Sequence, residues 1–350
     1  MTSPPGLDLD ALAAYLASMG DPPQGPLTAS VIPGGKSNLT YIVDAGERRL
    51  VLRRPPLAHV LPTAHDMSRE YRVLAALRDT DIPVPRVTAL CADASVLGAP
   101  FYVMEWVDGH VIRDTLPGEY PATPDTRRAM SAALVDTLAA LHAVVPGDVG
   151  LADFGHPAGF LERQVRRWWM QWEASKTRDL PSIEELHGRL EDTLPAQSPP
   201  GITHGDYRMD NVMFAPRDPG RIAAVLDWEM CTIGDPLCDL GLMLVYWAET
   251  QDEPSARRLQ GRALTVDDGF YSRREIIERY AAASTRDLSG LDWYIAFGAY
   301  KLAIIAEGIN ARFLLGMTVG DGFDQMGEMV PLLVDRALET ASGLPLAPRS

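Results

Sequence analysis

The segment HGDYRMDN at 204–211, followed by VLDWE at 225–229, carries the strongest pattern in this chain of 350 residues. Asp206 and Asn211 lie five residues apart on what we expect to be a loop after a strand. Asp227 ends the apolar run IAAVLD, and a strand end would hold its carboxylate rigidly toward that loop. Two carboxylates and an amide provide a base and the oxygen ligands that Mg²⁺ prefers, as phosphoryl transfer requires.

Asp206 and Asn211 have the spacing of the base and the metal-binding asparagine in the protein-kinase catalytic loop. The wider pattern, HGDxxxxN with LDWE and then GDPLCDL at 234–240, resembles the aminoglycoside phosphotransferase and choline kinase superfamily. This resemblance covers nearly the whole chain and implies a protein-kinase-like fold with ATP and Mg²⁺ as cofactors. It also implies that Asp206 is the catalytic base and that Asn211 and Asp227 hold the metal.

A closer resemblance links the chain to the kinase-like domain fused to certain eukaryotic acyl-CoA dehydrogenases. Four segments carry it: LPSIEELHGRL at 180–190, HGDYRMDNVMF at 204–214, AAVLDWEMCTIGDPLCDL at 223–240 and AYKLAIIAEGINARFLLG at 299–316. This branch implies a kinase that phosphorylates a hydroxyl of a small molecule, with a hydroxyacyl-CoA or a similar metabolite as the acceptor. An aminoglycoside acceptor and a catalytically silent nucleotide-binding module stay open as alternatives.

The pattern of short extended runs predicts an α+β fold with two lobes. Expected strands lie at 27–32, 39–44, 48–54, 86–91 and 101–107, with a helix at 65–77 between the third and the fourth. They form a small five-stranded antiparallel N-lobe with one helix, and the C-lobe is larger and mainly helical. We expect residues 1–24 to be an N-terminal extension with a helix, 25–108 to be the N-lobe and 109–350 to be the C-lobe.

The N-terminal helix is expected to begin at Asp8, a favourable N-cap, and to stop at Gly20, with Leu12, Leu16 and Met19 as its apolar face. Further helices are expected in the C-lobe at 124–144, 158–177, 182–193, 236–249, 271–283, 289–315 and 322–341. A β-rich stretch from Ile202 to Trp228 interrupts them.

The turn PGGKSN at 33–38 fits a loop that covers phosphates, because glycines let backbone N–H groups approach oxygen atoms closely. Glycine-rich turns are common, so the assignment depends on the larger pattern. Its candidate nucleotide-binding residues are Gly34, Gly35, Lys36, Ser37 and Asn38.

Arg53, in the strand LVLRR, takes the position of the phosphate-binding lysine that protein kinases carry on their third strand. Arg54 should face the opposite side of the strand, since successive side chains alternate. Glu70 on the following helix is the expected partner of Arg53, and a solvent-facing glutamate is the alternative. The resemblance implies roles in catalysis for both Arg53 and Glu70.

The segment FYVMEWVDG at 101–109 resembles the strand and hinge that bind adenine, with candidate residues Met104, Glu105 and Val107. Backbone groups recognise the base there, so the assignment depends on order along the chain. We expect His204, Asp235 and Asp239 to support the catalytic loop rather than to react. For the acceptor, the helix RQVRRWWMQW offers Arg163, Arg167 and Trp172 as candidates. A solvated basic face and core packing of the tryptophans are the alternatives.

The composition argues against several classes of partner. A net charge of −15 opposes binding to nucleic acid, and no apolar run reaches the ~20 residues that span a bilayer. The three cysteines include no CxxC pair, which is typical of a reducing compartment, and the N-terminus lacks the features of a signal peptide. We therefore expect a cytoplasmic protein whose partner is a small hydroxylated molecule. The sequence does not indicate its oligomeric state.

Overall fold

The computed structural model describes residues 3–32, 38–57, 66–252, 263–317 and 322–344 of the chain. The chain divides into two compact units. The first comprises Met1–Gly109 together with Ala223–Cys231, and the second comprises His110–Ile222 and Thr232–Ser350. The stretch Ala223–Cys231, which contains the LDWE motif, thus joins a unit from which it is remote in the sequence.

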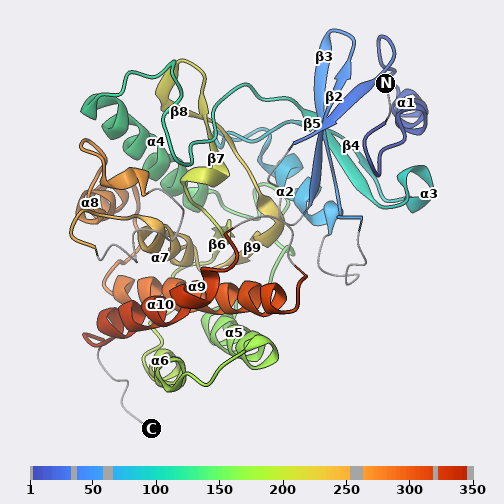
Figure 1. The fold of residues 1–350 in the computed structure, drawn as a ribbon. Coiled ribbons are helices and arrows are strands. Elements are labelled where there is room, and N and C mark those ends of the chain that lie inside the picture. Colours follow the sequence, from blue (N-terminus) through green and yellow to red (C-terminus); the bar gives the residue numbers. More distant parts are fainter. Residues whose placement is uncertain (1–2, 33–37, 58–65, 253–262, 318–321, 345–350) are drawn as a thin grey trace. The chain divides into compact units, whose positions relative to one another are not determined.

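A five-stranded antiparallel sheet in the order β1-β2-β3-β5-β4 forms the first unit (Figure 1). Its strands are β1 (Thr28–Val31), β2 (Leu39–Ala45), β3 (Arg48–Arg54), β4 (Val87–Cys91) and β5 (Phe101–Glu105). The five strands confirm the predicted α+β fold of the protein-kinase type. β3 lies at the centre of the sheet, where Arg53 pairs with Thr40 of β2 on one side and Tyr102 of β5 on the other.

Helices cover both faces of this sheet. The helix α1 (Leu9–Ser18) begins at the N-cap Asp8, whose side chain accepts from two backbone N–H groups. Its Leu12 and Leu16 are buried with inward residues of the sheet, whereas Met19 is 57% exposed, so the prediction for Met19 was wrong. Met19 lies beyond the last helical turn, where the apolar face no longer meets the sheet. The short helix α3 (Ala94–Leu97), which sequence patterns did not reveal, packs beside α1.

Alternation along β3 separates its two arginines. Leu50 and Leu52 belong to the core under α1, and Arg54 on the same face donates hydrogen bonds to the carbonyl oxygens of Gly6 and Leu97. Arg53 faces the other side, toward α2 (Met67–Leu77). The predicted alternation of the two side chains is therefore confirmed.

The second unit is mainly helical, as predicted. Its helices are α4 (Pro124–Ala143), α5 (Phe160–Ser175), α6 (Pro181–Asp192), α7 (Leu237–Tyr246), α8 (Arg273–Ala283), α9 (Leu291–Leu314) and α10 (Met326–Ala341). The interruption among them holds β6 (Gly201–Thr203), the hairpin strand β7 (Val212–Ala215) and β8 (Asp218–Val225), which continues into the first unit. The strand β9 (Thr232–Gly234), which was not predicted, pairs with β6.

The long helix α9 lies at the centre of the second unit and packs against α5, α6, α7 and α10 (Figure 1). Its contact with α7 is close because glycines line it. A Cβ atom on Gly241 would lie 2.4 Å from the carbonyl oxygen of Tyr294. This close packing fixes two helices that carry site residues, Asp239 on α7 and Lys301 on α9. Among the described residues, no helix has the length and apolarity to cross a bilayer.

Candidate active site

The catalytic-loop candidate begins where β6 ends. Gly205 has a φ of 88°, a left-handed conformation that glycine adopts without steric penalty. Asn211 lies in a short 3₁₀ turn, Met209–Asn211, and its Nδ2 donates to Oδ2 and to the carbonyl oxygen of Asp206, each at 2.8 Å. The amide nitrogen of Asn211 thus orients the carboxylate of Asp206.

Asp239 holds the backbone of the same loop. Its Oδ2 accepts the N–H of His204 at 2.6 Å, and its Oδ1 accepts the N–H of Gly205 at 2.8 Å. Burial alone would raise the pKa of Asp239, but a hydrogen bond and the charge of His142, the charge of His204 and the Gly205 N–H together lower it. A buried, ionised carboxylate therefore fixes the position of two consecutive peptide groups.

His204 and Asp235 have structural contacts. The Nδ1 atom of His204 accepts the N–H of Asp206 at 3.2 Å, and the side chain is fully buried. Asp235 accepts the N–H of Leu237 at 3.1 Å, near the start of α7, and the Tyr294 hydroxyl at 2.7 Å. His204 thus contacts the backbone of the loop, whereas these contacts of Asp235 lie at the start of α7 and on α9, outside residues 204–211.

Two cations near Asp206 were not singled out from the sequence. Arg208 Nε lies 3.5 Å from Oδ2 of Asp206, and its guanidinium stacks over the ring of Tyr246 at 4.8 Å. Lys301 of α9 is 8% exposed, and its Nζ donates to the carbonyl oxygen of Gly205 at 2.5 Å. Burial raises the pKa of Asp206, while the charges of Arg208 and Lys301 oppose that rise. One feature of the sequence hinted at a buried charge at Lys301, namely its place within the apolar run AYKLAII at 299–305.

Arg53 is the centre of a cluster of charges in the first unit. Its Nη2 lies 2.6 Å from Oδ1 of Asp227 and 3.7 Å from Oε2 of Glu229, and its Nε lies 3.0 Å from Oε2 of Glu70. The predicted ion pair between Arg53 and Glu70 is thus present. Burial would lower the pKa of Arg53, but the charges of Tyr102, Glu70 and Asp227 raise it, so the guanidinium stays protonated.

Glu70 is buried rather than facing solvent, with 2% of the residue exposed. Its carboxylate accepts from Asn38 Nδ2 at 2.9 Å and from the Tyr102 hydroxyl at 3.0 Å. Burial raises the pKa of Glu70, and the charge of Arg53 and the Tyr102 hydroxyl oppose this. Sequence reasoning did not assign Tyr102 or Glu229, although Glu229 belongs to the LDWE motif.

Asp227 adopts a left-handed backbone conformation with φ 65° and ψ 61°, and no other non-glycine residue among those described has a positive φ. Such strain is found most often at functional positions. The oxygen donors of Asp227 and Asn211 suit Mg²⁺, which usually binds one or two protein ligands together with phosphates and water. Within the described parts of the chain, no group of three or more His, Cys, Asp or Glu side chains is placed to hold a metal ion.

The nucleotide-binding candidates are described only in part. Gly34, Gly35, Lys36 and Ser37 lie outside the described residues, whereas Asn38 is buried beside Glu70. Met104 is 8% exposed on β5, and the N–H of Glu105 donates to the carbonyl oxygen of Arg86 at 2.8 Å. Val107 follows the strand and is half-buried.

The acceptor candidates on α5 have different surroundings. Trp172 is 1% exposed, as core packing requires. Arg163 donates to the carbonyl oxygens of His156 and Ala158. Arg167 is exposed, and its charge contributes to lowering the pKa of Lys301, for which burial is the largest cause. Of the three, Arg167 is therefore the exposed residue, and its charge acts on Lys301 of α9.

Comparison with known proteins identifies relatives along most of the chain. Human acyl-CoA dehydrogenase family member 11 is 35% identical over 340 residues, covering 95% of this chain and 43% of the relative. A probable acyl-CoA dehydrogenase of Arabidopsis thaliana, IBR3, is 32% identical, covering 95% of this chain and 42% of the relative. The chain thus spans less than half the length of these curated relatives.

Solved structures share the fold. A Ralstonia eutropha JMP134 protein, provisionally described as an aminoglycoside phosphotransferase, has 31% identity and a TM-score of 0.83, covering 97% of this chain and 99% of its own. A macrolide 2'-phosphotransferase of type I has 20% identity and a TM-score of 0.59 with full coverage of both chains, which shows the fold alone. The profile of the phosphotransferase enzyme family, APH, matches residues 28–276. Since that match covers well over half of the sequence, the chain belongs to the phosphotransferase enzyme family.

Proposed function

We propose that this chain transfers the γ-phosphate of ATP to a hydroxyl group of a small molecule. The observation that carries the proposal is the loop geometry around Asp206: Asn211 holds the carboxylate and Asp239 holds the preceding backbone. A rigidly placed carboxylate can orient an acceptor hydroxyl and accept its proton as the oxygen attacks phosphorus and ADP leaves.

The residues of the first unit are proposed to bind the nucleotide. The protonated Arg53, oriented by Glu70, would contact the α and β phosphates. Bound Mg²⁺, held by Asn211 and Asp227, would neutralise phosphate charge during transfer. The carbonyl of Glu105 and the N–H of Val107 are proposed to pair with adenine, beside Met104. The phosphate-covering loop at 33–38 stays part of this proposal.

A hydroxyacyl-CoA or similar anionic metabolite is the acceptor that we propose. The relatives named acyl-CoA dehydrogenases support it. So does the charge around the base, where Arg208 and Lys301 lie near Asp206 and Arg167 lies near Lys301. An aminoglycoside carries several ammonium groups, which these cations would repel. A silent binding module is disfavoured because the Asp206–Asn211 pair and the Arg53–Glu70 ion pair are intact.

The test is ATP consumption by the purified chain with hydroxyacyl-CoAs, aminoglycosides, choline, hydroxylated amino acids and sugars as acceptors. Asp206→Ala serves as the blank, and Mg·ATP binding to both proteins serves as the control for folding. We expect turnover with a hydroxyacyl-CoA that falls at least about 10³-fold in the variant while Mg·ATP still binds. An active Asp206→Ala protein would contradict the mechanism. Silence with every acceptor, despite Mg·ATP binding, would favour the binding module.

A further inference from the structure

Lys301 is a buried charge on the central helix of the second unit. The neighbouring residues Leu302, Ala303 and Ile304 are apolar and buried, as expected of a core helix. Removing an ammonium group from water costs several kcal/mol unless charged or polar partners offset the loss. Its burial therefore requires a compensating contact, and the catalytic loop provides that contact.

The partner of Lys301 is the peptide group that leads into Asp206. Its Nζ donates to the carbonyl oxygen of Gly205 at 2.5 Å, while the N–H of the same peptide group donates to Nδ1 of His204 at 3.2 Å. Asp239 accepts the two preceding N–H groups. Both polar atoms of the peptide between Gly205 and Asp206 thus have a partner. The partner of its carbonyl oxygen is Lys301, which lies on α9.

This peptide needs such restraint because it follows a glycine. Glycine has the greatest backbone freedom of any residue type, and a rotation at Gly205 would move the carboxylate of Asp206. A displacement of about 1 Å in a reacting group can cost on the order of 10²-fold in rate. The ring of Trp168, 5.5 Å from Nζ, packs against the ammonium group from α5 and holds it in place.

We propose that Lys301 is a positioning residue for the transfer step, which fixes Asp206 through the carbonyl oxygen of Gly205. The inference rests on the proposed function, because it concerns the base of that reaction. Lys301 touches neither the acceptor nor the nucleotide in this proposal. Its loss should therefore lower kcat and leave the KM for ATP nearly unchanged.

The first test compares Lys301→Met with the wild type in the acceptor assay. Methionine has a similar length and no donor, so the space stays filled while the contact to Gly205 is lost. We expect kcat to fall about 10- to 100-fold, as for other groups that orient reactive residues, with the KM for ATP within about threefold. Lys301→Arg, which keeps a charged donor, should recover part of the lost kcat. Lys301→Met with unchanged kcat would overturn the proposal.

Asn310→Ala is the matched control on the same helix. Asn310 is 6% exposed and donates to Oγ1 of Thr177 at 3.2 Å, away from the catalytic loop. We expect it to lower the melting temperature without a selective loss of kcat. The loss of kcat is compared with the loss of melting temperature in each variant. If the two variants show the same ratio, Lys301 is merely structural and the proposal fails.

Amide hydrogen exchange gives a readout that needs no acceptor. Loss of the hydrogen bond to the Gly205 carbonyl should let the loop open more often, so the amides of 204–206 should exchange about tenfold faster or more in Lys301→Met. Those of α10 should stay within about twofold. If the wild type phosphorylates nothing, the proposed function fails, and exchange still decides whether Lys301 holds the loop. Should Lys301→Met not fold, Lys301→Leu, which also lacks a donor, is compared in the same way. Unchanged exchange at 204–206 would overturn the proposal.

Discussion

Arg53 and Asp227 are 174 residues apart in the sequence, yet Nη2 of Arg53 lies 2.6 Å from Oδ1 of Asp227. The contact exists because Ala223–Cys231 belongs to the first unit. Asp227 has a left-handed backbone, which costs on the order of 1–2 kcal/mol for a residue with a Cβ atom. The ion pair with Arg53 offsets part of that cost and holds the carboxylate in the geometry that we assign to a metal ligand.

Asp227→Asn should weaken the binding of Mg·ATP. Asparagine tolerates the left-handed conformation well, so the substitution removes charge with little change in backbone strain. We expect the Kd of Mg·ATP to rise about tenfold or more. Titration calorimetry at several Mg²⁺ concentrations measures it, with Asp206→Ala as the control that retains binding. An unchanged Kd would remove Asp227 from the proposed metal ligands.

Glu70→Gln should destabilise the first unit and raise the KM for ATP. The carboxylate forms an ion pair with Arg53 and accepts hydrogen bonds from Asn38 and Tyr102. An amide would lack the charge and would replace one acceptor oxygen with an NH2 donor. Breaking a buried ion pair costs about 3–5 kcal/mol of unfolding free energy. Urea denaturation measures the loss. Glu105→Gln, an exposed carboxylate on β5, is the control and should change stability by less than about 0.5 kcal/mol.

Local patterns predicted much of this fold. The alternation in β3 separated Arg53 from Arg54, and the spacing of Asp206 and Asn211 indicated a loop whose hydrogen bonds the structure contains. Contacts across long sequence distances had no such signal. Nζ of Lys301 meets a carbonyl 96 residues away, which no periodicity encodes. The elements α3 and β9 are four and three residues long, too short for a periodic pattern.

Arg167→Ala should raise the KM for the acceptor with little effect on the KM for ATP. Arg167 is exposed, so a contact to an anionic group would be worth about 1 kcal/mol, or roughly five- to tenfold in KM. Arg166→Ala, exposed one position earlier on the same helix, is the matched control. Equal effects on both substrates, or none, would argue against an anion-binding role. Arg163→Ala should also raise the acceptor KM, partly by releasing the carbonyl oxygens of His156 and Ala158.

His142 should make the protein sensitive to mild acid. It is buried between Asp239, 3.4 Å from Nε2, and the Tyr280 hydroxyl, 2.8 Å from Nδ1. Burial and the charge of Arg286 lower the pKa of His142, although Asp239 opposes them. The folded environment therefore disfavours the protonated imidazole of His142, whose ring nitrogens contact Asp239 and the Tyr280 hydroxyl.

The sign of the pH effect follows from this lowered pKa. In the unfolded chain, His142 binds a proton once the pH falls below its ordinary pKa of about 6.5. The contribution of the buried His142 to the unfolding free energy is therefore fully present above that pH and declines as the pH falls. One proton gives a slope of at most about 1.4 kcal/mol per pH unit. His142→Gln should flatten the dependence of unfolding free energy on pH between about 6.5 and 5. His187, whose pKa burial also lowers, is present in both proteins and cancels. Equal slopes would contradict the prediction.

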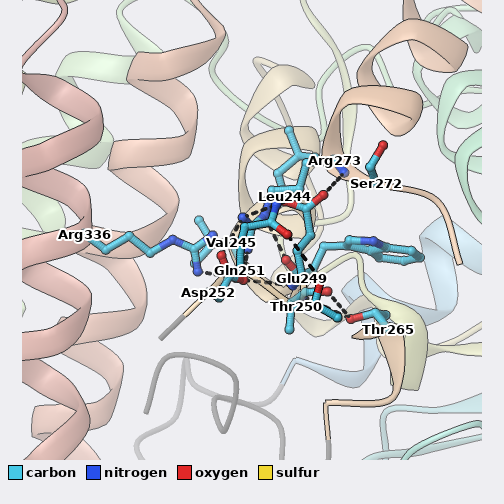
Figure 2. A network of polar contacts seen from close by, with 12 residues as sticks. Leu244, Val245, Glu249, Thr250, Gln251, Asp252, Thr265, Ser272, Arg273 and Arg336 are labelled. Atoms are coloured by element: carbon cyan, nitrogen blue, oxygen red, sulfur yellow. Dashed lines mark hydrogen bonds and ion pairs between the residues drawn. The ribbon is translucent and has the colours of Figure 1, made fainter. Parts of the chain in front are cut away.

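Arg273 ties the end of α7 to the start of α8, as Figure 2 shows. Its Nε donates to the carbonyl oxygens of Leu244 at 3.2 Å and Trp247 at 2.9 Å. Its Nη1 donates to Glu249 at 3.1 Å and to Asp252 at 2.9 Å. One guanidinium thus satisfies terminal carbonyl groups of a helix and two carboxylates at once.

Arg273→Met should therefore destabilise the second unit. The side chains of Arg273 and Asp252 are only 21% and 13% exposed, so the carboxylates would lose their cation in a poorly hydrated setting. We expect a loss of about 2–4 kcal/mol in unfolding free energy, measured by urea denaturation. Arg274→Met is the control, because that neighbouring side chain is 86% exposed and pairs with Glu278 on the surface. It should change stability by less than about 0.5 kcal/mol. Equal losses in the two variants would show that the network in Figure 2 contributes no more than a surface ion pair.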